Sequence, residues 1–472
     1  GLLGAGVKLA VSGFGWLRGS IEGALAAGPG RSLFLGADLS PALLAVGYIV
    51  GLPVASQIFL GGALGWLVLI PLAPEWVAGL APEDVRLLAV VEPGYEGAAT
   101  ERAWSLWSYG IRYVGVGAMA VGGLAALYRI RGGLRRAVAE LRSGWSSLSG
   151  GRASRSVDLP TPWILGVGAA AVLLVLWLYW RFTGDLGVAV LAAAIMVVAS
   201  FFFVGVASYI VGLVGNSNSP VSGMTITAVL ATGALLWLVG YSGTEGMIAT
   251  LGVAAIVCCA ACTAGDVCND LKTGSIVGAT PWRQQSMQLA GVVIAALVMA
   301  PVLQLLHDAY GIGSRELAAP QASLFASLAK GFFGGEALPW GLIGLGAGVG
   351  ASFLALDAVL AARETRFRLH LMPIAVGLYL PFGLALPILA GGLVEWATRR
   401  PERAGSGTGA REGVLFASGV VAGEALVGVA IAVAVGLGVA GGRADYAGSG
   451  GVGLVAALLI VAVFARAVRP RP

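Results

Sequence analysis

The sequence predicts an all-α protein that crosses a membrane many times. Of its 472 residues, 58% are hydrophobic and only 11% are charged, whereas an ordinary soluble domain is about 25% charged. So few charges cannot cover a water-facing surface of this size, which excludes a soluble enzyme, a disordered protein and a nucleic-acid-binding protein of the usual kind. The 74 glycines fit closely packed membrane helices, in which small residues let backbones approach each other.

Twelve apolar runs are candidates for membrane-crossing segments, since a crossing takes roughly 20 residues. Ten of them are predicted to be simple spanning helices, at 2–17, 104–128, 162–181, 186–213, 224–241, 246–264, 285–306, 338–362, 413–439 and 451–467. The other two, 41–73 and 371–397, contain internal prolines and glycines. We expect these two segments to be broken helices or re-entrant hairpins, because proline interrupts helical hydrogen bonding.

Loop charges predict the orientation. Loop 129–157 carries seven Arg and one Glu, whereas stretch 74–101 carries six acids and one Arg. Cytoplasmic loops are rich in Lys and Arg, so we expect loop 129–157 and the C-terminal tail inside a plasma or inner membrane. The predicted organisation is the end of a first repeat with its hairpin (1–128), a basic cytoplasmic linker (129–161) and a second half with its own hairpin (162–472).

The two interrupted segments resemble each other. Residues 45–66 align without a gap on residues 375–396, with eight of 22 positions identical. Because the loop charges place the ends of the first segment outside and those of the second inside, the similarity predicts an inverted repeat. Such repeats place a substrate site near the membrane midplane. The alternative is a chance match between two glycine-rich helices.

Segment 214–226 is the strongest candidate for substrate binding. It places uncharged polar residues and helix breakers between two apolar spans, and polar backbone at membrane depth is tolerated only where it is buried in protein or lines a cavity. The candidate residues are Asn216, Asn218, Ser219, Pro220, Ser222, Gly223 and Met224. An ordinary polar loop is the alternative.

Three acids are candidates for proton coupling. Glu424 lies near the centre of span 413–439, where a charge costs a few kcal/mol and should face a cavity or a partner. Asp266 and Asp270 are four residues apart and therefore share a helical face. Glu424 could instead be a structural hydrogen-bonding residue, and the aspartates could simply mark the end of a helix.

Other interior residues have simpler interpretations. Asp357 and Arg112 are candidate interior partners, and the arginines of segment 363–369 are expected to be solvated. Glycines at alternate positions of span 338–362, namely Gly344, Gly346, Gly348 and Gly350, favour helix packing. The four cysteines, Cys258, Cys259, Cys262 and Cys268, are interpreted as small apolar helix residues, and no metal site is predicted.

Four motifs in order resemble the oligopeptide transporter (OPT) family, closest to its prokaryotic members and the yellow-stripe-like branch. They are Asn-Ser-Pro-Val-Ser-Gly-Met-Thr-Ile (218–226), Ala-Gly-Asp-Val-Cys-Asn-Asp-Leu-Lys-Thr-Gly (264–274), Val-Gly-Ala-Thr-Pro-Trp-Arg-Gln-Gln (277–285) and Ala-Pro-Gln-Ala-Ser (319–323). The last two motifs add Gln285 and Gln321 to the substrate-binding candidates. The family is usually longer at the N-terminus, so we expect the N-terminal part of its fold to be missing here.

The resemblance implies secondary active uptake of oligopeptides or siderophore-like metal–chelate complexes by alternating access, driven by a proton gradient without a cofactor. The expected partners are the small substrate and membrane lipid, with no nucleic acid, and a homo-oligomer is left open. The alternative is an intramembrane metal-dependent enzyme of prenyltransferase type that uses Asp266 and Asp270 to hold magnesium. That chemistry needs a second acidic cluster on the same face, so we expect a transporter and not an enzyme.

Overall fold

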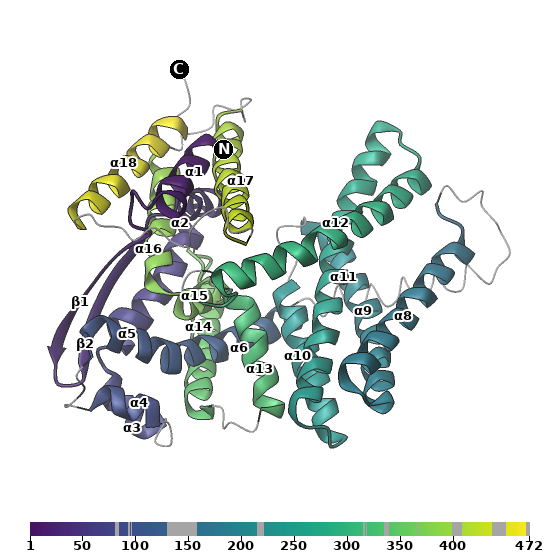
Figure 1. Cartoon of the computed structure of the whole chain (residues 1–472), viewed down its shortest axis with the longest axis horizontal. Helices are drawn as coiled ribbons and strands as arrows, with labels where there is room; N and C mark the ends of the chain where they lie inside the picture. The colour runs from purple at the N-terminus through teal and green to yellow at the C-terminus, as the bar shows by residue number, and fades with distance from the viewer. Residues whose placement is uncertain are drawn as a thin grey trace. The chain divides into compact units, whose positions relative to one another are not determined.

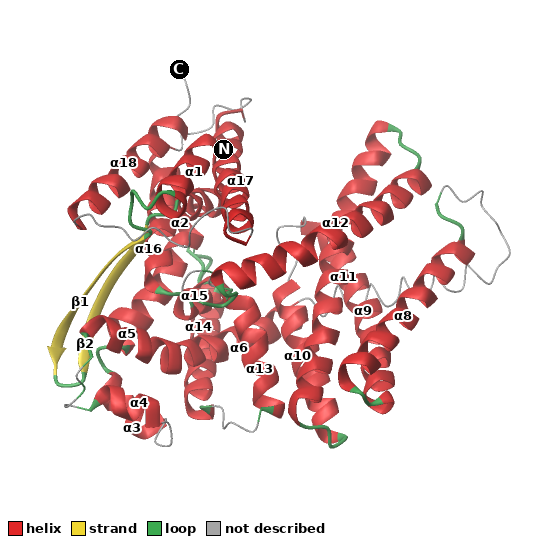
Figure 2. Ribbon diagram, in the orientation of Figure 1, coloured by secondary structure: helices red, strands yellow, loops and turns green. Residues whose placement is uncertain are grey.

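The computed structural model describes the chain apart from residues 81–84, 93–94, 96, 130–157, 215–220, 315–316, 318, 335–338, 366, 399–407, 437–449 and 469–472. The described part is almost entirely helical (Figure 2). It divides into two compact units. The first unit comprises Gly1–Val121, Val302–Pro320 and Pro339–Pro472, and the second comprises Gly122–Pro301 and Gln321–Leu338.

The first unit joins the two ends of the chain (Figure 1). Its N-terminal elements are α1 (Leu2–Lys8), η1 (Leu9–Gly13), β1 (Ser20–Gly28), β2 (Arg31–Asp38), α2 (Pro41–Ala63), η2 (Leu64–Leu69), α3 (Ala73–Leu80), α4 (Val85–Val91), α5 (Ala99–Leu106), η3 (Trp107–Ile111) and the start of α6 (Arg112–Arg129). Its C-terminal elements are α14 (Trp340–Ala362), α15 (Leu371–Tyr379), α16 (Phe382–Thr398), α17 (Thr408–Gly436) and α18 (Gly450–Val468). The three η elements are π-helical turns.

The second unit contains the middle of the chain. Its helices are α8 (Thr161–Thr183), α9 (Leu186–Val214), α10 (Val221–Leu238), α11 (Gly243–Val277), most of α12 (Pro281–Tyr310) and α13 (Pro320–Phe333). Helix α9 packs on both α11 and α8, and α10 packs on α11. Glycines allow close packing here, since Gly233 and Gly246 contact the rings of Phe332 and Phe333.

Membrane-spanning helices are confirmed as the main feature of the fold. Among the described residues, seven helices are long and apolar enough to cross a bilayer. They include six of the ten predicted simple spans, as well as Pro41–Leu69. Predicted spans 2–17, 224–241 and 451–467 correspond to shorter apolar helices, and span 104–128 is divided among α5, η3 and α6. The chain is therefore an integral membrane protein.

The sequence analysis predicted no β-structure, but residues 20–38 form a hairpin. Strands β1 and β2 pair antiparallel from Ser20 with Asp38 to Gly28 with Arg31, and they are the two long arrows in Figure 1. The sequence contains a signal for this turn, because Gly28 and Gly30 flank Pro29 and both glycines have positive φ angles. Along β2 buried residues alternate with less buried ones, as expected for a strand with one covered face.

Both interrupted segments are broken, as predicted. In α2 the helix is interrupted at Gly51, which has φ 77° and ψ 165°, a conformation that favours glycine. In the other segment, Leu380 is extended with φ −74° and ψ 148°, and Pro381 separates α15 from α16. In the alignment of the two segments Gly51 falls opposite Pro381, so the two breaks occur at the same position. Whether either segment returns to the same membrane face stays a prediction.

The two broken segments pack on each other through reciprocal contacts. A Cβ added to Gly47 would overlap the carbonyl oxygen of Ile388, and one added to Gly377 would overlap the carbonyl oxygen of Ile58. The sequence alignment pairs residues that are 330 positions apart, so Gly47 corresponds to Gly377 and Ile58 corresponds to Ile388. The two contacts are therefore equivalent, with the glycine and the carbonyl on exchanged segments.

A second pair of contacts follows the same rule. An added Cβ at Gly61 would overlap the carbonyl oxygen of Ile374, and one at Gly391 would overlap that of Leu44. Contacts that recur with exchanged partners are the mark of a two-fold arrangement, as at a symmetric dimer interface. At each of these four places backbone packs directly on backbone, which only glycine permits.

Only half of the alternating glycines of α14 pack against another helix. Added Cβ atoms at Gly346 and Gly350 would meet the backbone of α6, whereas Gly344 and Gly348 have open space around them. The packing prediction therefore applies to the pair spaced four residues apart. This spacing corresponds to one helical face.

Candidate functional site

Glu424 on α17 binds the N-terminal end of the broken helix α2. Its Oε1 accepts a hydrogen bond from the Ser40 hydroxyl at 2.8 Å, and its Oε2 accepts one from the Ala42 backbone N–H at 2.8 Å. Ser40 also caps α2, because its hydroxyl oxygen accepts a hydrogen bond from the Leu43 N–H at 3.2 Å. The carboxylate therefore lies at the positive end of the helix dipole, where free N–H groups and a negative charge stabilise each other.

Close packing of α1 on α17 fixes the position of Glu424. A Cβ added to Gly4 would meet the backbone of Val420 and Glu424, and one added to Gly423 would meet the carbonyl of Gly1. Among the described residues, no Lys or Arg forms an ion pair with Glu424. The carboxylate is thus held by hydrogen-bond donors alone. Binding a proton would either turn the Ser40 hydroxyl from donor to acceptor or displace the Ala42 N–H.

The equivalent helix in the other half of the first unit carries no acid at this place. Helix α6 packs on α14 through Gly117, whose added Cβ would meet the carbonyl of Ile343. On α17, Gly423 makes the matching contact with the carbonyl of Gly1. Gly117 and Gly423 are 306 positions apart, so the residue of α6 that corresponds to Glu424 is Ala118. The matching contact on α6 therefore has an alanine where α17 has Glu424.

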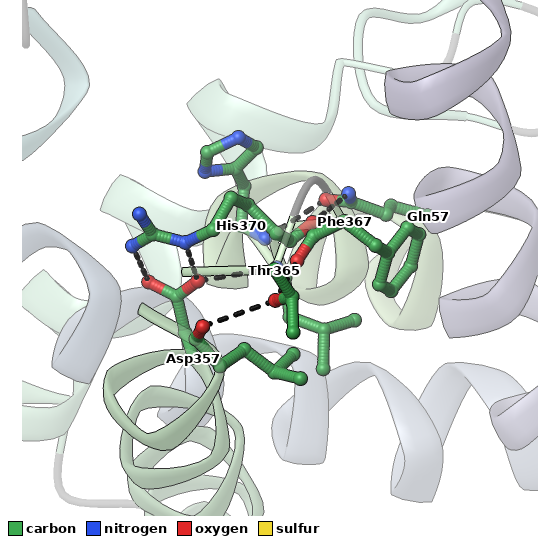
Figure 3. A network of polar contacts seen from close by, with 8 residues as sticks. Gln57, Asp357, Thr365, Phe367 and His370 are labelled. Carbon is green, nitrogen blue, oxygen red and sulfur yellow. Dashed lines mark hydrogen bonds and ion pairs between the residues drawn. The ribbon is translucent and has the colours of Figure 1, made fainter. Parts of the chain in front are cut away.

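The connector before α15 is held by a different set of polar groups, shown in Figure 3. Asp357 on α14 is 1% exposed and accepts hydrogen bonds from Arg368 Nε at 2.9 Å, from Arg368 Nη2 at 3.0 Å and from the Leu369 N–H at 3.2 Å. From α2, Gln57 donates to the Arg368 carbonyl at 2.8 Å and accepts from the His370 N–H at 2.9 Å. We call these residues the connector latch.

The connector latch corrects two expectations. Asp357 pairs with Arg368 rather than with Arg112, and Arg368 is therefore not merely a solvated charge. The hydrogen bond from Arg368 to Asp357 raises the pKa of the guanidinium, so this cation stays charged. This pairing could not be predicted from the sequence, because it depends on how the connector between α14 and α15 folds back on Asp357.

Replacing Gln57 with Leu should destabilise the protein. The change leaves the Arg368 carbonyl and the His370 N–H without their partner, at a cost of about 1–3 kcal/mol. We expect a lower Tm for Q57L in detergent. Gln304→Leu is the matched control, because Gln304 is exposed and bonds only Asp308 within its own helix among the described residues. Equal Tm values for Q57L and Q304L would contradict the assignment.

Arg112 stands at the break between α15 and α16. Its guanidinium carbon lies 5.5 Å from the ring centre of Tyr379, the last residue of α15, and 5.9 Å from that of Trp107. The backbone of Tyr379 approaches Gly115, one turn further along α6. Trp66 also contacts the break, because its indole N–H donates a hydrogen bond to the Leu380 carbonyl at 3.3 Å.

The candidate substrate segment falls largely outside the described residues. Asn216, Asn218, Ser219 and Pro220 are not described, and neither is the side chain of Ser222. The other two candidate residues of this segment are buried. Met224 is 0% exposed, and Gly223 packs against the backbone of Gly123. Substrate binding by this segment stays a prediction.

Asp266 and Asp270 lie on one face of α11 and are both exposed. The helix continues to Val277, so the alternative that the pair marks a helix end is wrong. Asp270 Oδ2 accepts a hydrogen bond from Gln288 at 2.6 Å. Asp270 therefore connects α11 to α12.

The two glutamines taken from the motifs lie in the second unit. Gln285 accepts a hydrogen bond from the Leu159 N–H at 2.8 Å and donates to Asp158 at 3.0 Å, so its described contacts hold the residues before α8. The Oε1 of Gln321 is buried and has no hydrogen-bond partner among the described residues, which leaves it available to a ligand. Neither glutamine has a tested role in substrate binding.

Comparison with known proteins decides the family. The family model described as "OPT oligopeptide transporter protein" matches residues 5–435. The chain belongs to the OPT family. It is 31% identical over 441 residues to the "Putative oligopeptide transporter" of Haemophilus influenzae, covering 85% of this chain and 67% of the relative. It is 26% identical over 187 residues to the "Probable metal-nicotianamine transporter YSL13" of Oryza sativa subsp. japonica, covering 38% of this chain and 25% of that protein.

OPT membership also decides between transporter and enzyme. The names of the family and of both relatives are those of transporters, so the chain is a transporter and the prenyltransferase alternative is set aside. Among the described residues, no three His, Cys, Asp or Glu side chains are grouped to hold a metal ion. The cysteines of α11 are free and at least partly exposed.

The sequence analysis missed several residues of this OPT protein. The partner of Glu424 was one of them, although Ser40 followed by Pro41 is a recognisable start of a helix and a helix start attracts a carboxylate. Gln57, a polar residue within the apolar run 41–73, was not among the predicted residues either. Nothing in the sequence indicated that the side chain of Arg112 faces Tyr379, 267 positions further along the chain.

Proposed function

We propose that this OPT transporter is a proton-coupled importer of small peptides or metal–chelate complexes that works by alternating access. The substrate classes are those named for its two relatives. The observation that carries the coupling is the contact of Glu424 with Ser40 and Ala42. It joins an ionisable group directly to one of the two broken helices. No cofactor is needed, because the proton gradient supplies the free energy.

Proton binding at Glu424 would change the packing of α2. As a carboxylate, Glu424 accepts from two donors on two separate oxygens. A proton on Oε2 would face the Ala42 N–H, which can only donate, and a proton on Oε1 would require the Ser40 hydroxyl to change from donor to acceptor. The contact with the N-terminal end of α2 then weakens, and the stabilising charge at the positive end of the dipole is lost. Proton uptake thereby favours a different arrangement of α17 and α2.

The reciprocal glycine contacts support an inverted repeat around the two broken helices. Repeats of this kind place substrate and coupling ion at discontinuous helices near the midplane, and rocking of one repeat alternates access. In the proposed orientation, in an inner or plasma membrane, the C-terminus and loop 129–157 are cytoplasmic, since these segments hold the excess of arginines. The substrate contacts come from segment 214–226, together with Gln285 and Gln321.

Uptake into proteoliposomes tests the proposal. Radiolabelled trialanine and the zinc complex of nicotianamine are offered separately, with the outside acidic and then with equal pH on both sides. We expect accumulation of one of them above its outside concentration only under the gradient, and its loss after addition of a protonophore. Accumulation that is equal with and without the gradient would contradict proton coupling.

A further inference from the structure

Arg112 is a half-buried cation without an anionic partner in the described part of the chain. Its described contacts are the aromatic faces of Trp107 and Tyr379. Asp357, the acid that was expected as an interior partner, accepts hydrogen bonds from Arg368 and from the Leu369 N–H. Glu424 is occupied by Ser40 and Ala42. Arg112 thus keeps all five N–H donors of its guanidinium for another acceptor.

A second donor beside Arg112 also lacks a partner. The indole Nε1 of Trp107 is buried and makes no hydrogen bond within the described residues, and the ring that carries it is one of the two that face the guanidinium. A buried donor without a partner destabilises the fold, because its desolvation is not compensated. Two unsatisfied donors together indicate a place for an acceptor that the described part of the chain does not supply.

The surrounding backbone is specialised at this point. Trp107 begins the π-helical turn η3, which ends at Ile111, and Arg112 follows it as the first residue of α6. Single π-turns within helices occur frequently at functional sites. Tyr379 precedes the break at Leu380, so the guanidinium lies where one of the two broken helices is interrupted. Discontinuous helices are where transporters hold their solutes.

Aromatic contacts alone do not explain a cation here. A cation over an aromatic face is only modestly stabilised, whereas a charge withdrawn from water is costly unless it is paired with an opposite charge and hydrogen-bonded. A carboxylate fits the planar fork of an arginine with two parallel hydrogen bonds. The rings of Trp107 and Tyr379 would hold the guanidinium flat and leave the edge of its fork for that carboxylate.

We propose that Arg112 binds a carboxylate of the transported solute, with the Trp107 indole N–H as a second donor. This inference rests on the proposed function, since it identifies the chemical group of the solute that the transporter recognises. Both proposed substrate classes supply such a group, because a peptide ends in a carboxylate and nicotianamine carries carboxylates that chelate metal. A solute without any carboxylate would not engage the site.

Binding in detergent, without any gradient, tests the site separately from transport. The probes are trialanine, trialanine amide and zinc–nicotianamine, and the readouts are thermal stabilisation and the dissociation constant. We expect the wild-type protein to bind a carboxylate probe at least about 10-fold more tightly than trialanine amide, since only a carboxylate can form the bidentate charged pair. Arg112→Gln should remove this preference, and Arg112→Lys should restore part of it.

Arg86→Gln is the matched control. Arg86 also lies over an aromatic ring, 4.7 Å from the centre of Tyr109, but its side chain is exposed, so the variant should keep wild-type binding. Binding of trialanine or zinc–nicotianamine shows which class supplies the carboxylate. Equal binding of trialanine and its amide by the wild type, no binding of either carboxylate probe, or unchanged preference in R112Q would overturn the inference. If carboxylate binding depends on Arg112 but uptake ignores the proton gradient, only the proposed coupling fails.

Discussion

Glu424→Gln is expected to abolish proton-driven accumulation while leaving substrate binding and gradient-free exchange intact. Glutamine has nearly the shape of the acid, and its amide oxygen can still accept a hydrogen bond from Ser40 or from Ala42, as Glu424 does. It cannot bind or release a proton at neutral pH. The measurement compares uptake with and without an inward proton gradient in proteoliposomes that contain equal amounts of folded protein.

Asp266→Asn and Asp270→Asn are the comparison variants. Both side chains are exposed on α11, and Asp270 bonds Gln288 of α12. We expect both variants to keep proton-driven uptake. Unchanged uptake in E424Q with an inactive D266N would transfer the coupling to the aspartate pair.

Alanine at Gly47 or at Gly377 should strongly destabilise the protein, and by similar amounts. Each added methyl group would overlap a backbone carbonyl oxygen, that of Ile388 or that of Ile58. A backbone atom cannot rotate away as the end of a side chain can, and overpacking of a tight core costs typically 1–3 kcal/mol or more. We expect lower yield of folded protein and a lower Tm for both variants.

Gly344→Ala is the control, and the expected sign is opposite. An added Cβ at Gly344 has open space around it within α14, and alanine is favoured over glycine in a helix by about 1 kcal/mol. This variant should be unchanged or slightly more stable. Equal Tm values for G47A and G344A would show that the backbone contact contributes nothing. Clearly unequal losses in G47A and G377A would contradict the two-fold arrangement of the contacts.

The sequence predicted the features that depend on local chemistry. Prolines and glycines within 41–73 and 371–397 indicated two broken helices, and the alignment of 45–66 on 375–396 placed their breaks opposite each other. Long apolar runs predicted most of the spanning helices. These features need no knowledge of tertiary contacts, because backbone hydrogen bonding inside a membrane must be satisfied within the segment itself.

Predictions failed where a residue acts through a distant partner. Glu424 was recognised as an unusual acid, but its partners lie more than 380 positions earlier in the chain. Arg368 was expected in solvent because it occurs in an arginine-rich connector, yet it binds the buried Asp357. The hairpin at 20–38 was missed because its apolar residues were searched for helical spans only, and a two-residue turn with glycines on both sides of Pro29 was not considered.

The backbone-to-backbone packing of α2 on α15 and α16 limits how this part of the protein can deform. Sliding of packed helices normally proceeds by small changes of the side chains between them, but no side chain separates Gly47 from Ile388 or Gly377 from Ile58. We therefore expect the paired segments to move as a rigid body. Bending is confined to Gly51 and Leu380, where the helical hydrogen-bond ladder is interrupted. A substitution that restricts the backbone at Gly51 or Leu380 should therefore hold the paired segments in one conformation without changing the contacts between them.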